Sequence, residues 1–97
     1  MLHCSCVVYA RQRGVAIPYN TDAGDLVPNS PPTPGGLVLL RYPKADHVAV
    51  ITGFTEHGVM VREGNYKHCK ETIREIRFDD RALRGFWTPS VSTTTPK

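Results

Sequence analysis

The chain has 97 residues, of which 40% are hydrophobic, and its formal net charge is +3. This length accommodates one domain with a single modest core and leaves no room for a second. Basic residues are scattered among acids, so we expect no specific nucleic-acid binding, although the positive charge suits contact with an anionic polymer.

The first predicted element is a short helix over residues 6–13. Ser5 is a favourable N-cap residue, and Gly14 is a natural residue to end a helix. Cys6 would then be the first helical residue, where unpaired N–H groups and a partial positive charge stabilise a thiolate and can hold an oxyanion. Cys6 is therefore the candidate nucleophile, although most free cysteines are small buried hydrophobic residues.

Residues 15–35 are too rich in Pro, Gly, Asn and Asp for a regular element. We predict a loop here that forms a functional border or a mobile flap. Asn20, Asp22 and Asp25 are ligand types found in calcium loops, but the terminal bidentate acid of an EF-hand is absent. We therefore predict solvated turn residues, with no metal and no cofactor.

Predicted strands follow the loop, at residues 37–42, 47–54, 58–63, 72–78 and 83–88. A turn over 53–58 would pair the second and third strands as an antiparallel hairpin. The fourth alternates apolar and charged residues, which indicates a sheet with one wet face. We predict an α+β domain over 1–89, with the helix packed on a curled antiparallel sheet of four or five strands. The Thr-rich residues 90–97 would be a disordered tail or linker.

Three polar residues occupy the ends of the predicted hairpin strands. His47 heads one strand, while Glu63 and Asn65 end the other and would share one face. An imidazole at this end could accept the thiol proton of Cys6, and a carboxylate or amide could orient the ring. The plainer interpretations are a strand-end histidine bonded to a carbonyl, and a surface carboxylate paired with a nearby cation.

Five short segments then follow one another in a familiar order: CVVYAR (6–11), PGGLVLL (34–40), HVAVI (47–51), EGNY (63–66) and RGFWTP (84–89). Together they resemble the CHAP amidase/peptidase domains, relatives of the NlpC/P60 peptidases in the papain-like group. The resemblance implies a papain-like fold and a thiol hydrolase that cuts amide bonds in bacterial peptidoglycan. It also implies that Cys6 is the nucleophile, that His47 is the base, and that Glu63 orients the ring with support from Asn65.

Two positions differ from the family pattern. Ser5 stands where a glutamine often precedes the nucleophile, and Gly35-Gly36 stands where Gly-Asp often precedes the first core strand. The second oxyanion donor is therefore not identified. Two other functions fit the same residues: an inactive wall-binding or virion structural module, and a cysteine protease that acts on a protein substrate.

The remaining cysteines raise two further questions. Three cysteines are an odd number, so at least one thiol is left over. Cys4 could pair with Cys69 and leave Cys6 free, but reduced cysteines are the simpler expectation. Together with His3 these are zinc-ligand types, yet they lack the paired spacing of structural zinc sites, and we predict no zinc.

Targeting signals are also not recognisable in the sequence. No apolar run reaches the roughly 18 residues of a membrane helix. Residues 1–15 lack the charged start, apolar centre and cleavage site of a secretory signal. We expect a soluble monomer without a membrane span, which would reach a cell wall after lysis or by delivery, as on a phage.

Overall fold

The computed structural model describes residues 5–67 and 70–89, without the side chains of 65–67. Its elements are the helix α1 (Cys6–Gln12), the 3-10 turn η1 (Ala23–Asp25), and the strands β1 (Leu37–Tyr42), β2 (Ala45–Phe54), β3 (Gly58–Lys67), β4 (Lys70–Arg77) and β5 (Leu83–Trp87). One short helix and five antiparallel strands confirm the predicted α+β class. No helix in these described ranges is long and apolar enough to cross a membrane. The predicted tail over 90–97 lies outside the described residues.

Helix α1 begins and ends at the predicted signals. The Ser5 hydroxyl accepts a hydrogen bond from the Val8 N–H at 3.2 Å, so Ser5 is the N-cap and Cys6 is the first helical residue. Gly14 follows the helix with a φ of 96°, a conformation that favours glycine. The capping signals therefore fix where the Cys6 side chain leaves the helix.

The predicted 15–35 loop is more structured than its composition indicates. Val15, Ile17, Ala23 and Leu26 are buried in the core on the helix side of the sheet, and η1 forms within the segment. The expectation of no regular element is wrong at η1, because small and apolar residues between the Pro and Asp residues pack against the sheet. This segment is part of the core as well as a border of the site.

The sheet has the strand order β4-β3-β2-β1-β5, and every neighbouring pair is antiparallel. The predicted hairpin of β2 and β3 is confirmed, and it is closed by a hydrogen bond of 2.9 Å from the Thr55 N–H to the Gly58 carbonyl. Strand β2 starts at Ala45, two residues earlier than predicted. Because β2 and β3 are antiparallel, His47 and Glu63 lie at the same end of the hairpin.

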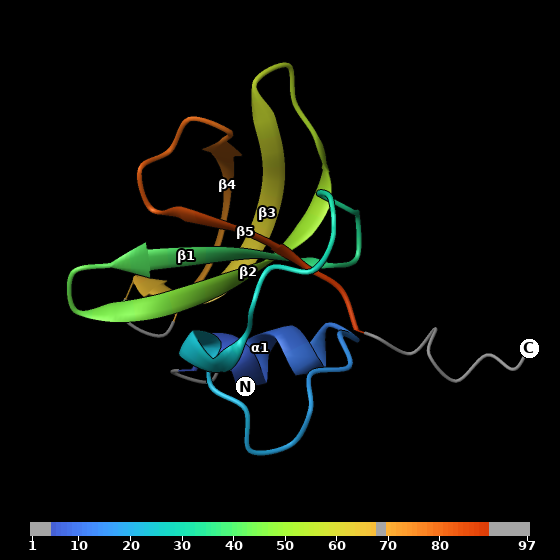
Figure 1. The fold of residues 1–97 in the computed structure, drawn as a ribbon, viewed down its shortest axis with the longest axis vertical. Helices are drawn as coiled ribbons and strands as arrows, with labels where there is room; N and C mark the ends of the chain where they lie inside the picture. The colour runs from blue at the N-terminus through green and yellow to red at the C-terminus, as the bar shows by residue number, and fades with distance from the viewer. Residues whose placement is uncertain (1–4, 68–69, 90–97) are drawn as a thin grey trace, which may run out of the picture.

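Each face of the sheet buries its own core. Figure 1 shows α1 lying alongside the β1–β2 hairpin, and the helix packs against both β2 and β3. The face toward α1 buries residues such as Leu37, Leu39, Val48 and Val50. The opposite face buries residues of β1 to β4: Val38, Leu40, Ala49, Ile51, Val59, Val61 and Ile76. Because strand side chains alternate, Tyr42, His47 and Glu63 belong to this second face, at one end of its apolar core.

Strand β4 does not follow the predicted division into one wet and one apolar face. Ile73 is 56% exposed, whereas Ile76 is buried. Arg74 shares the inward face with Ile76 because the two residues are two positions apart. A charged side chain therefore lies beside the buried end of the sheet, where the alternation of residue types does not indicate one.

Candidate active site

The candidate site is built on a buried histidine and a buried carboxylate. His47 is 7% exposed and Glu63 is 0% exposed. The Nε2–H of His47 donates a hydrogen bond of 2.7 Å to Oε1 of Glu63. The alternative in which Glu63 is a surface charge is therefore wrong. A buried carboxylate is stable only when it is paired, and His47 is a partner of Glu63. Because the hydrogen bond joins Nε2 to Oε1, it also fixes the orientation of the imidazole ring.

Cys6 supplies the third group from the start of α1. Its side chain is partly buried and free of any disulfide, and its interaction with the His47 side chain is among the causes that raise the pKa of His47. Because Nε2 of His47 is bonded to Glu63, the ring nitrogen left for the sulfur is Nδ1. The structure thus brings Cys6, His47 and Glu63 together in that order.

The surroundings of His47 favour its protonated form. Burial alone would lower the pKa of His47, but hydrogen bonds to Cys6 and Glu63 and the negative charges of these groups raise it from 6.5 to about 9. Near neutral pH the ring is therefore an imidazolium beside the sulfur.

Arg74 extends the site beyond the carboxylate. Its Nη2 donates to Oε1 of Glu63 at 3.1 Å and to the hydroxyl of Tyr42 at 2.9 Å, and its Nε donates to Oε2 of Glu63. Burial alone would raise the pKa of Glu63, but hydrogen bonds and positive charge from His47 and Arg74 lower it. His47, Glu63, Arg74 and Tyr42 thus form one hydrogen-bonded chain, and Cys6 interacts with its His47 end. These five residues are called the polar row below.

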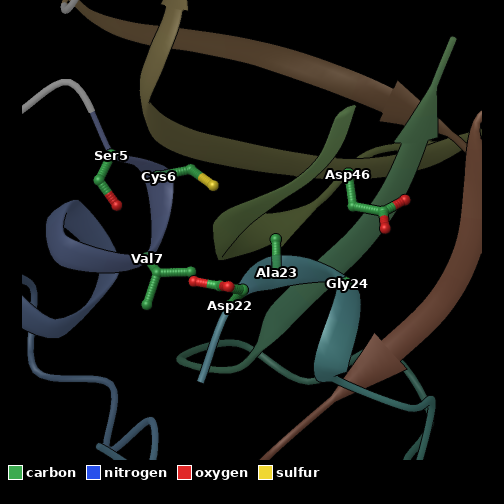
Figure 2. A pocket seen from close by; sticks show the side chains of 7 residues that line it. All are labelled: Ser5, Cys6, Val7, Asp22, Ala23, Gly24 and Asp46. Carbon is green, nitrogen blue, oxygen red and sulfur yellow. The ribbon is translucent and has the colours of Figure 1, made fainter. Parts of the chain in front are cut away.

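A pocket of about 320 Å³ opens beside the sulfur. Figure 2 shows the Cys6 sulfur pointing from the start of α1 toward the space beside Ala23, with Asp46 lining the far side of the pocket. The Cα of Gly24 lies so close to β2 that a Cβ there would be 2.6 Å from Oδ2 of Asp46. The 15–35 segment therefore forms one wall of the pocket.

Other residues considered from the sequence stand apart from this arrangement. Asn65 lies on β3, but its side chain is outside the described residues, so its supporting role stays a prediction. His3, Cys4 and Cys69 are also outside the described residues, which leaves the zinc and disulfide alternatives untested.

Arg74 was not predicted as a site residue from the sequence. Its spacing of two from the buried Ile76 is the signal that could have placed it on the inward face.

Comparisons of the chain with protein-family models, with curated proteins and with solved structures find no match. The resemblance to the CHAP family therefore stays a prediction that depends on the quoted residues. The geometry of the polar row is independent of that resemblance, and it carries the functional argument.

Proposed function

We propose that the protein is a cysteine amidase or endopeptidase with a papain-like site, and that it cleaves amide bonds of bacterial peptidoglycan. The observation that carries the chemistry is the buried His47, which interacts with Cys6 and donates a hydrogen bond to Glu63. A sulfur nucleophile, an imidazole and an orienting carboxylate are the parts that thiol-dependent acyl transfer needs. Peptidoglycan as the substrate is inferred from the family resemblance.

In the first step the Cys6 thiolate attacks the carbonyl carbon of the amide and forms a C–S bond. The tetrahedral oxyanion lies near the start of α1, where the N–H of Cys6 is one donor. The His47 imidazolium gives its Nδ1 proton to the amide nitrogen, the C–N bond breaks, and an amine leaves. The product is a thioester on Cys6 and a neutral His47.

In the second step water attacks the thioester carbon. His47 takes one proton from that water, the C–S bond breaks, and a carboxylic acid leaves. The sulfur departs as a thiolate and His47 is again an imidazolium. Throughout both steps Glu63 accepts the Nε2–H, which keeps Nδ1 directed at the sulfur. The pocket beside Cys6 gives the substrate access from the open side.

Hydrolysis of purified peptidoglycan tests this proposal. Wild-type protein should lower the turbidity of a peptidoglycan suspension and release one new amino group for each bond cut, without new reducing sugar ends. Cys6→Ala should lower the rate by about 10³-fold or more, because the nucleophile is lost. Arg77→Gln is a suitable control, since Arg77 is exposed and pairs with the nearby Asp79.

The same assay separates the two other functions. Equal clearing by wild type and Cys6→Ala would remove Cys6 from the mechanism. Binding of both proteins to pelleted peptidoglycan, without release of amines by either, would instead indicate an inactive wall-binding module. Release of amines from denatured casein, with peptidoglycan left intact, would indicate a protease that acts on protein substrates.

A further inference from the structure

The guanidinium of Arg74 reaches the candidate site from strand β4, which contributes no other group to it. Arg74 is not among the described residues that line the pocket, and it donates to both oxygens of Glu63 and to the Tyr42 hydroxyl. In the β3–β4 ladder Arg74 lies opposite Val61, diagonally next to Glu63 on the same face. The register of this hairpin therefore sets the contact between guanidinium and carboxylate.

Glu63 has charged neighbours on two sides. His47 faces it from β2 and Arg74 faces it from β4, while Cys6 lies beyond His47 and Tyr42 lies beyond Arg74. A carboxylate with no exposed surface is stable only if such partners compensate its lost hydration. During the reaction His47 gives its proton away and becomes neutral. Arg74 is then the one cation still bonded to the carboxylate among the described residues.

We propose that Arg74 is a positioning residue of the site, which keeps Glu63 ionised throughout the reaction and fixes the oxygen that faces His47. The two-pronged contact occupies Oε2 and one lone pair of Oε1, so the remaining lone pair of Oε1 is directed at Nε2. A protonated Glu63 could instead donate to Nε2, and His47 would then lose its orienting acceptor. This inference deepens the proposed function and relies on it for the catalytic consequence.

Carbon-13 NMR of the Glu63 carboxyl carbon tests the inference directly. In the wild type Glu63 should remain a carboxylate to a pH below its usual range. In Arg74→Gln its titration should move upward by about 1–3 pH units, because the adjacent cation is lost. The acid limb of the pH–rate profile for amine release should move in the same direction.

Two further variants distinguish positioning from general support of the fold. Arg74→Lys keeps the positive charge, so Glu63 should titrate within about one pH unit of the wild type. The rate of amine release can still fall, because lysine cannot make the two-pronged contact of a guanidinium. Arg77→Gln removes an exposed arginine from the same strand and should leave the Glu63 titration unchanged. If Arg74→Gln does not fold, Arg74→Lys decides the question. A Glu63 titration close to that of the wild type supports the proposal, and an upward shift as large as that expected for Arg74→Gln contradicts it.

An unchanged Glu63 titration in folded Arg74→Gln would overturn the proposal. This measurement does not depend on the substrate. If the wild type releases no amines from peptidoglycan but Glu63 shifts in Arg74→Gln, the proposed function fails while the role of Arg74 in ionising the carboxylate stands. If amines are released but Glu63 does not shift, the proposed function stands and the role of Arg74 fails.

Discussion

Each residue of the polar row comes from a different element. Cys6 begins α1, Tyr42 ends β1, His47 is in β2, Glu63 is in β3 and Arg74 is in β4. Apart from Tyr42 and His47, which are separated only by the β1–β2 turn, these residues are far apart in sequence. The row as a whole therefore exists only when the helix has docked and the sheet has its native register. The nucleophile therefore gains its imidazole partner only in the folded state, and this state alone should show an activated thiol.

Glu63→Gln tests the charge of the orienting group, because it keeps the size and removes the negative charge. The rate of amine release should fall by about 10²–10⁴-fold, as when an orienting carboxylate is neutralised in a catalytic triad. The negative charge of Glu63 also raises the pKa of His47. Its loss should move the alkaline limit of activity to lower pH. A pH–rate profile with an unchanged alkaline limit would show that Glu63 does not act through His47.

The sequence alone predicts a large part of this row. Cys6, His47 and Glu63 are recognisable because helix capping places Cys6 at the start of a helix and the hairpin brings His47 and Glu63 onto neighbouring strands. Their order also matches the family that the sequence resembles. Arg74 and Tyr42 are not recognisable in this way. The place of Arg74 depends on the β3–β4 register, and the places of both residues depend on which face of their strand is buried. In β4 the apolar Ile73 suggests the wrong buried face, because Ile73 is exposed.

At the scale of elements, α1 is held against the sheet by the side chain of Tyr9. The ring lies directly over Gly64 of β3, and the Tyr9 hydroxyl donates to the Glu71 carboxylate on β4. Burial and this hydrogen bond raise the pKa of Tyr9 to about 12, so the hydroxyl keeps its proton at neutral pH. These contacts position the whole helix, and with it Cys6.

Gly64→Ala tests this docking. A Cβ at Gly64 would lie 2.8 Å from the Cβ and Cγ of Tyr9, atoms near the backbone that cannot move aside without the helix. The free energy of unfolding should fall by about 1–3 kcal/mol, as overpacking usually costs, and amine release should fall with it. Gly53→Ala is the matched control, since a Cβ there meets nothing within 4 Å. Equal urea midpoints for the two variants would contradict the close contact.

The elements themselves are largely predictable, and the exceptions have physical reasons. The bounds of α1 and β1 follow from capping residues and from an uninterrupted apolar run. The 15–35 segment is harder to predict because its buried residues are separated by Pro, Gly and Asp, so they have neither helical nor strand periodicity. Its contribution to the pocket wall depends on tertiary packing, which a local pattern does not contain.

For the whole molecule, the buried ionised pair makes stability depend on pH. The raised pKa of His47 means that its contribution is complete below 6.5 and is lost as the pH rises through about 9. The lowered pKa of Glu63 means that its contribution is present above 4.5 and is lost as the pH falls through the folded value. The pair therefore stabilises the fold most between about pH 4.5 and 6.5.

Urea unfolding at several pH values measures this dependence. The wild-type midpoint should fall between pH 6.5 and pH 10, and it should fall again below pH 4.5. In His47→Gln the alkaline fall should become smaller, because the group that loses its proton in that range is gone. A wild-type midpoint that rises from pH 6.5 to pH 10 would show that His47 is not held as an imidazolium in the folded protein.

Alkylation of the cysteines measures whether contact with His47 activates Cys6. Folded protein is treated with iodoacetamide at pH 6, and the modified cysteines are located by mass spectrometry of its peptides. We predict that Cys6 reacts faster than any other cysteine of the chain, and that His47→Ala removes this advantage. Preferential modification of another cysteine, or the same Cys6 rate in both proteins, would contradict the account.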